Sequence, residues 1–408
     1  MDGLFNAMMM GVSENYLIPY GIALGATASQ IATLASAPML VASILQVRSA
    51  SLTQSIGSRT KLINVVVLFH VLTWLPIILI PFVLPHEKLL TLRPWALLLA
   101  ATLFVSFGAF AVPAWQSLMS DYIPVKKRGK YFGWRNRLQG VLMVSTSVAA
   151  GLILHFFGKN ALQGFTMIFI FAMLCRLLSW ICLTRMREPF RHTSHDIYFS
   201  FLDFIKQIRT SPALARERGT GNFAKFVLFV SLMSFSVNIS SPLLAVFLLR
   251  DIEFSYAAYM VVVTTASLSG FLCQGLWGKY GDAHGNLRAL KIAGWGIALI
   301  PVLWMFSHKL IYLFFVQLIA GAFWGGFNLL VTNFILEAVS PEKRIRCTAY
   351  FNVMNSVSVF LGALCGGLLI HRLPEFLGYS FLLLFLISCV ARVLVMSVIA
   401  NKAREIRV

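Results

Sequence analysis

KRIRCTAYFNVMNSVSVFLGALCGGL, residues 343–368, repeats the outline of KRGKYFGWRNRLQGVLMVSTSVAAGL, residues 127–152. Both segments begin with a Lys-Arg pair, carry an Asn at the same place and continue into a long apolar stretch. The same offset places Arg176 on Arg392, and a slightly longer one places Asn15 on Asn238. The sequence therefore indicates that the chain consists of two related apolar halves.

The composition indicates that much of the surface of this chain faces lipid. Its 408 residues are 58% hydrophobic and only 12% charged, which is more apolar side chain than a soluble protein of this length buries. Apolar runs of about 20 residues, the length that crosses a bilayer as a helix, recur throughout. We expect an all-α membrane protein with twelve spans, at about 4–25, 29–47, 61–83, 94–118, 136–157, 161–184, 222–249, 255–276, 288–306, 310–335, 349–370 and 376–400.

The net charge of +19 is distributed according to the sides of a membrane. Most of the 34 Lys and Arg residues fall in the even-numbered gaps between spans and in the C-terminal tail, while the odd-numbered gaps hold Lys88, Arg93, Lys159, Arg250, Lys309 and Arg372. Because basic residues concentrate in cytoplasmic loops, we expect a multi-pass protein of the bacterial cytoplasmic (inner) membrane with both termini in the cytoplasm. The basic charge then indicates which loops lie on the cytoplasmic side of the membrane, and no nucleic-acid partner is expected.

Nothing in the sequence indicates an enzyme. There is no phosphate-binding glycine loop, and His, Asp and Glu show neither metal-ligand spacing nor a paired-acid site. The six cysteines form no CxxC pair, so neither a disulfide framework nor a metal is predicted. We expect no cofactor, no metal and a monomeric chain.

The spans divide into two groups of six. We expect an N-terminal six-helix bundle at 1–190, a central cytoplasmic segment at 191–221 and a C-terminal six-helix bundle at 222–408. Within the central segment, apolar residues recur at helical spacing over 197–208, which predicts a short amphipathic helix on the membrane surface.

GKYGDAHGNLR, residues 278–288, joins the eighth and ninth spans. It resembles the cytoplasmic signature of the major facilitator superfamily, a glycine, an aspartate and a second glycine followed by basic residues. Ala283 departs where that family usually has arginine, whereas the matching residues are Gly278, Asp282, Gly285 and Arg288.

Two further segments extend the resemblance. Residues 54–61 form a weaker first-half counterpart, in which Gly57 is kept but Gln54 replaces the aspartate. The stretch that begins DYIP at 121 is similar to the loop after the family's fourth helix. Its residues and their second-half echo are Asp121, Arg128, Glu337 and Arg344.

The resemblance covers nearly the whole chain and implies two six-helix bundles that rock about a central cavity. It implies that helices 1, 4, 7 and 10 line that cavity and that helices 3, 6, 9 and 12 scaffold it. The aspartate of the loop signature can accept backbone N–H groups at a helix end and pair with basic residues. The signature would therefore act as a conformational latch and not as a substrate site.

Polar residues within the spans are the candidates for transport. Glu14 lies about 10 residues into the first span, or ~15 Å along the helix, where a carboxylate is costly unless paired, hydrated or protonated. It is either a proton carrier or a counter-ion for a cationic group on the solute, or else the structural partner of a buried donor. Asn15 and Asn238 are expected to face each other across the cavity, with Ser241 on the same stripe as Asn238, or else to hold helices together.

Aromatic and amide groups recur on the fourth and tenth spans. They suit an amphipathic organic solute, although helix packing explains them equally well; these residues are Trp115, Gln116, Trp324, Asn328 and Thr332.

Arg176 and Arg392 are pseudo-symmetric intramembrane charges. An intramembrane arginine is a functional hypothesis by default, but capping of carbonyls or snorkelling favours a structural role for both. His70, in the middle of the third span, is expected to be a scaffold residue bonded to the backbone and not a proton relay.

The sequence therefore predicts a secondary active transporter of a small, amphipathic organic solute, working by alternating access with ion or proton coupling. Its expected partners are that solute, the lipid bilayer and protons. A lipid or lysolipid flippase on the same fold, and a non-transporting membrane sensor or scaffold, remain as alternatives.

Overall fold

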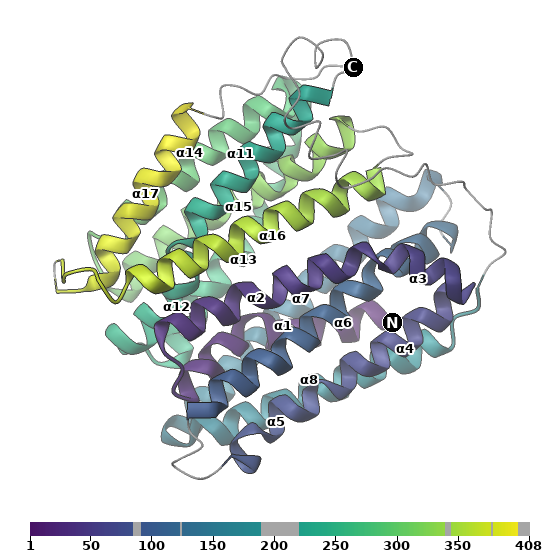
Figure 1. Cartoon of the computed structure of the whole chain (residues 1–408), viewed down its shortest axis with the longest axis horizontal. Helices are drawn as coiled ribbons and strands as arrows, with labels where there is room; N and C mark the ends of the chain where they lie inside the picture. Colours follow the sequence, from purple (N-terminus) through teal and green to yellow (C-terminus); the bar gives the residue numbers. More distant parts are fainter. Residues whose placement is uncertain (85–90, 123–124, 189–219, 339–343, 377, 399–408) are drawn as a thin grey trace. The chain divides into compact units, whose positions relative to one another are not determined.

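The computed structural model describes all residues except 85–90, 123–124, 189–219, 339–343, 377 and 399–408, and helices make up nearly all of the described chain (Figure 1). The chain divides into two compact units. The first is Met1–Thr193 with Ala245–Thr264, and the second is Ser194–Leu244 with Thr265–Val408. The amphipathic helix expected at 197–208 lies outside the described residues.

The first half folds into a series of helices with short connections. They are α1 (Asp2–Ala23), α2 (Ala28–Val47), α3 (Ser49–Ile56), α4 (Arg59–Leu72), α5 (Trp74–Val83), α6 (Arg93–Tyr122), α7 (Val125–Phe157), the 3-10 turn η2 (Gly158–Asn160) and α8 (Ala161–Thr184). Local chemistry sets several of the helix ends. Thr27 and Gln30 form a capping box at the start of α2, and Gly57, at φ +71°, ends α3.

The second half repeats this helical order. Its elements are α11 (Thr220–Asn238), η3 (Ser241–Leu243), α12 (Leu244–Val246), the π-turn η4 (Phe247–Asp251), α13 (Tyr256–His284), α14 (Asn286–Leu303), α15 (Leu310–Ala338), α16 (Arg344–Leu369) and α17 (Ser380–Val398). Gly285, at φ +98°, makes the sharp turn between α13 and α14.

The described helices have the length and apolarity of membrane spans. Eleven stretches in the described part of the chain are long and apolar enough to cross a bilayer, with α4 and α5 forming one of them, Arg59–Val83. The more polar α1, at 22 residues, is ~33 Å long at 1.5 Å per residue and completes a set of six in the first half. Large apolar side chains such as Phe156 and Leu272 are exposed, as lipid-facing residues are. The prediction of an all-α membrane protein is confirmed.

In the first unit, α1 is packed tightly against α7 and α8. A Cβ added at Gly11 would lie 2.3 Å from the carbonyl oxygen of Met143, so only glycine lets α1 and α7 approach this closely. The Tyr16 hydroxyl donates to the carbonyl oxygen of Ser147 on α7. Because these contacts hold one face of α1 against α7, they determine which residues of α1 lie on its opposite face.

In the second unit, glycines bring pairs of helices into backbone contact. Gly321 and Gly325, one turn apart on α15, face α13; a Cβ at Gly321 would lie 2.0 Å from the carbonyl oxygen of Ala266. The Ser269 hydroxyl donates to the carbonyl oxygen of Leu318 at 2.6 Å across the same interface. Close approach through small residues is a main way in which helices associate in lipid, where hydrophobic burial gives little driving force.

Replacing Gly321 by Ala should therefore force α13 and α15 apart. Since the added methyl group meets backbone and not a flexible side chain, we expect a loss of about 1–3 kcal/mol of stability. The matched control is Gly275→Ala on α13, where nothing lies within 4 Å of the added Cβ. Thermal unfolding of the detergent-solubilised protein measures both variants, and equal midpoints for the two would contradict the proposed contact.

Candidate functional site

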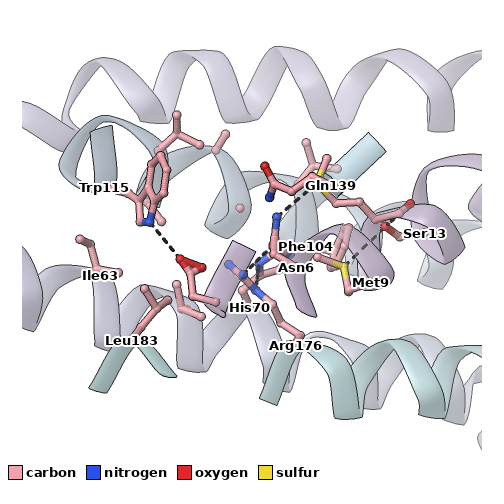
Figure 2. Close-up of a pocket in the computed structure, with 18 of the residues that line it drawn as sticks. Asn6, Met9, Ser13, Ile63, His70, Phe104, Trp115, Gln139, Arg176 and Leu183 are labelled. Atoms are coloured by element: carbon pink, nitrogen blue, oxygen red, sulfur yellow. Dashed lines mark hydrogen bonds between the residues drawn. The ribbon is translucent and has the colours of Figure 1, made fainter. Parts of the chain in front are cut away.

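A cavity of about 540 Å³ lies within the first unit, lined by residues of α1, α4, α6, α7 and α8 (Figure 2). Its wall is mixed. Met9 and Phe104 contribute apolar surface, and Asn6, Gln116 and Gln139 contribute amide groups. Every lining residue lies between Asp2 and Leu183, so the cavity belongs entirely to the first six-helix segment.

Arg176 of α8 is the central charge of this cavity. Its side chain is almost fully buried, yet the residue lines the cavity. The Nε–H donates to Nδ1 of His70 at 3.1 Å, and Nη1 donates to Oδ1 of Asn6 at 2.6 Å and to Oγ of Ser179 at 3.2 Å. Figure 2 shows Arg176 beside His70 and Asn6. The arginine thus joins α8 to α4 and α1.

His70 is held in one orientation by its neighbours. Because Nδ1 accepts the hydrogen bond from Arg176, a neutral ring carries its proton on Nε2. The ring lies 4.4 Å, centroid to centroid, from Phe104, and a Cβ at Gly108 would lie 3.2 Å from its Cε1. The predicted bond from His70 to the backbone is wrong, because the structure pairs the ring with the side chain of Arg176.

Trp115 of α6 forms the other polar part of the cavity. Its Nε1–H donates to Oδ2 of Asp2 at 3.2 Å; Figure 2 draws this bond as the dashed line that begins at Trp115. The guanidinium carbon of Arg135 lies 4.4 Å from the centre of the indole ring, within the range of a cation–π interaction. Gln139 donates to the carbonyl oxygen of Gly3 at 2.6 Å. The start of α1 is therefore anchored to α6 and α7.

Two of the first-half transport candidates, Trp115 and Gln116, line the cavity. Asn15 instead donates from Nδ2 to Oγ of Ser147 at 2.8 Å, a bond between α1 and α7. Glu14 belongs to α1, but its side chain lies outside the described residues.

The second unit has a smaller cavity, of about 90 Å³. It is lined by Ser241, Trp324 and Arg392 among the predicted residues, together with Gln317 and Trp304. Neither of these two cavities includes the remaining second-half candidates. Asn238 donates to the carbonyl oxygen of Ser234 within its own helix, and Thr332 donates to that of Asn328.

Arg392 is enclosed by groups that satisfy each of its nitrogens. Nη1 donates to the carbonyl oxygen of Ile297 at 3.0 Å, and Nη2 donates to that of Val237 at 3.4 Å. Nη2 also reaches Oγ of Ser240, and Nε reaches Oγ of Ser388. The carbonyl capping favoured for both arginines thus describes Arg392, whereas Arg176 contacts side chains.

At the first-half counterpart of the loop signature, Glu188 takes the place of the missing aspartate. Its carboxylate accepts from Oγ of Ser58 at 2.6 Å, from the backbone N–H and the Nε–H of Arg59, each at 3.0 Å, and from Oγ1 of Thr60 at 3.1 Å. The carboxylate thus joins the start of α4 to the segment after α8. Sequence reasoning missed this contact because Glu188 is far from residues 54–61 in the chain.

The second-half signature has its own geometry. Asp282 and Arg288 are exposed, while Gly278 and Gly285 are partly buried. A Cβ at Gly281 would lie 2.6 Å from Oδ1 of the buried Asn286, so the turn is tightly packed. The other latch candidates have side chains outside the described residues: Asp121, Arg128, Glu337 and Arg344.

The comparison with known proteins identifies a family whose model matches this chain. The model of the Major Facilitator Superfamily matches residues 3–236 and 226–407. The efflux pump azaK of Aspergillus niger is 29% identical over 107 residues, which cover 26% of this chain and only 23% of that pump's length.

Solved transporter structures have the same fold. A mutant of the nucleoside transporter NupG has a TM-score of 0.73 at 12% identity, covering 99% of both chains. The xylose transporter XylE from E. coli has a TM-score of 0.69 at 11% identity, covering 99% of this chain and 97% of its own. A bacterial homologue of the human lysosomal transporter Spinster has a TM-score of 0.70 at 15% identity, covering 99% and 95%. At these identities the similarity concerns the fold alone.

Glu188→Gln should destabilise the first unit at neutral pH. Partial burial alone would raise the pKa of Glu188, but the hydrogen bonds from Ser58, Arg59 and Thr60 lower it to about 2. Stability from a depressed carboxyl pKa is complete above the unfolded value of 4.5 and is lost as the pH falls toward 2. We expect a cost of about 1–3 kcal/mol at pH 7 and a smaller gap at pH 3.

Thermal midpoints in detergent at the two pH values test this prediction. The control is Glu375→Gln, in an exposed loop of the second unit, which should change the midpoint little at either pH. A gap between the wild type and Glu188→Gln that is the same at both pH values would contradict the assigned role of the carboxylate.

Proposed function

The chain belongs to the major facilitator superfamily, and we propose that it carries a small amphipathic organic solute across the membrane by alternating access. As a member it is a transporter and not an enzyme, and it is a multi-pass integral membrane protein. The class of solute, the coupling ion and the sidedness belong to the proposal.

The cavity of the first unit is the observation that carries this proposal. Its volume of about 540 Å³ falls within the range of small-molecule sites, roughly 300–1,000 Å³. The lining combines an indole, a phenyl ring and methionine side chains with a few amide and charged groups. Such a lining suits a solute that has an apolar body and a polar end.

The lining helices agree in part with the roles that the family resemblance implies. The first and fourth spans, α1 and α6, supply Asn6, Trp115 and Gln116. The third and sixth spans, expected only to scaffold the cavity, supply His70 and Arg176. We therefore assign solute contact to residues of all four helices.

Coupling to protons is proposed for Glu14. It lies on α1 next to Ser13, which lines the cavity, and a carboxylate within a span is costly unless it is paired, hydrated or protonated. Proton uptake there would make solute release depend on the proton gradient.

The bacterial cytoplasmic membrane, with both termini in the cytoplasm, is the proposed location. The proposal rests on the concentration of Lys and Arg on one side of the spans. We also propose the division into bundles at 1–190 and 222–408 with a cytoplasmic segment between them, and a monomeric transporter.

Reconstituted protein tests proton coupling directly. We expect solute jumps on proteoliposomes to give a pH change and a current on solid-supported membranes, and both should disappear in Glu14→Gln. The matched control, Glu253→Gln in an exposed turn between spans, should retain both signals. Equal signals in wild type and Glu14→Gln would remove Glu14 from the coupling mechanism. Movement of lipid alone would favour the flippase, and the absence of any transport by folded protein would favour the sensor.

The cavity itself is tested at Trp115. Trp115→Ala removes both the ring and the anchor of Asp2, so we expect the KM for the transported solute to rise about tenfold, equivalent to ~1.4 kcal/mol. The control is Trp295→Ala, an exposed tryptophan of α14, which should leave the KM unchanged. An unchanged KM in Trp115→Ala would place solute binding elsewhere.

A further inference from the structure

The two pseudo-symmetric arginines have different surroundings. Both side chains are almost fully buried, at 6% exposure for Arg176 and 5% for Arg392. Arg392 borders a cavity of about 90 Å³ and reaches a carbonyl or hydroxyl oxygen from each nitrogen. Arg176 borders a cavity of about 540 Å³ and contacts only side chains. The repeat has kept the residue but not its environment.

The hydrogen bonds of Arg176 leave part of its guanidinium available. A guanidinium has five N–H donors. The Nε–H donates to His70, and the two hydrogens of Nη1 donate to Asn6 and Ser179. The two hydrogens of Nη2 have no acceptor among the described side chains and backbone groups. Nη2 is not one of the fully buried unpaired atoms of the described chain, so a ligand in the adjoining cavity can reach it and accept its hydrogens.

The partners of Arg176 do not neutralise it. Asn6 and Ser179 are uncharged, and His70 is neutral because its Nδ1 accepts a hydrogen bond. No carboxylate in the described part of the chain forms an ion pair with Arg176. Asp2, which also lines the cavity, is bonded to Trp115, and its charge acts on Arg176 without forming an ion pair.

Among the residues that the structure describes, the charges on the cavity wall leave an excess of positive charge. Two cations, Arg135 and Arg176, and one carboxylate, Asp2, are the charged side chains in the described lining. Arg135 is stacked over the Trp115 ring. One uncompensated cation matches a monoanion, whereas a dianion such as a phosphate monoester would need a second free cation.

We propose that Arg176 binds the carboxylate of an amphipathic organic monoanion through Nη2, with the apolar body of the solute against Trp115 and Phe104. This inference rests on the proposed function and narrows its solute class. Charge-assisted bonds of arginine to carboxylates are among the stronger hydrogen bonds in proteins, and the water-poor interior strengthens them further. Arg392, each of whose three nitrogens has a partner within the protein, is a structural residue only.

Matched pairs of acids and amides test the proposal on the purified full-length protein in detergent. The probes are indole-3-acetate with indole-3-acetamide and 1-naphthoate with 1-naphthamide, measured by calorimetry at pH 7.5, where both acids are ionised. We expect each carboxylate to bind about tenfold more tightly than its amide, a difference of ~1.4 kcal/mol. Since the two members of a pair have nearly the same shape, the difference reports the negative charge.

Three variants test which residue causes the preference for carboxylates over amides. Arg176→Gln should abolish the preference for carboxylates. Arg392→Gln, the matched control, should lower the thermal midpoint but preserve the preference in the protein that remains folded. Asp2→Asn should tighten carboxylate binding severalfold, because it removes a like charge from the cavity, and should affect the amides less.

The proposal is overturned if wild-type protein binds amides as well as acids, if neither acid binds at millimolar concentration, or if the preference survives in Arg176→Gln. Should Arg176→Gln fail to fold, the wild-type comparison and Asp2→Asn still decide the outcome. Proteoliposomes that transport neutral or cationic amphipaths without a preference for acids would refute the anion site and leave the transport function standing. Absence of transport for every solute would count against the proposed function itself.

Discussion

The contact of Arg176 with His70 and Asn6 is the interaction on which the cavity of the first unit depends. It joins the sixth, third and first spans through three side chains. Because lipid offers a guanidinium no hydrogen-bond acceptors, the helices supply most of its partners. The hydrogen bonds of Arg176 therefore hold α1, α4 and α8 close together at this position. The close approach of Gly108 to the His70 ring shows how little space the arrangement leaves on the side of α6.

The fold could be predicted from the sequence because lipid imposes simple rules. Apolar runs of fixed length become helices, and basic residues mark one side of the membrane. The repeat then sets the number of spans. The register within a span was also accessible in places, since Trp115 and Gln116 do line the cavity. The family resemblance rests on the twelve expected spans, the repeat, the central cytoplasmic segment and the three loop segments together, and the family model confirms it.

The partners of polar side chains could not be predicted in the same way, because they depend on which helices meet. Nothing in the sequence distinguishes Asn6, Arg135 or Gln139 from other polar residues. Helix packing alone brings them into the site. The role of Glu188 had the same origin, since its partners at Ser58 and Arg59 come from a different part of the chain. Periodicity identifies which face a residue occupies but not the side chain that it meets.

The repeat clarifies what duplication preserves in this chain. A glycine lets two helices meet closely in each half, at Gly11 on the first span of one half and at Gly362 and Gly366 on the fifth span of the other, and each lies against the backbone of a neighbouring helix. These glycines do not occupy equivalent positions of the repeat. The repeated arginines are constrained by chemistry, and one environment can change without loss of the fold provided that the charge still finds partners. Carbonyl oxygens supply those partners around Arg392. Around Arg176 the neutral side chains supply only some of them, and a larger space remains beside the guanidinium. The two copies have therefore diverged in how completely the buried arginine is paired, while the arginine itself is kept.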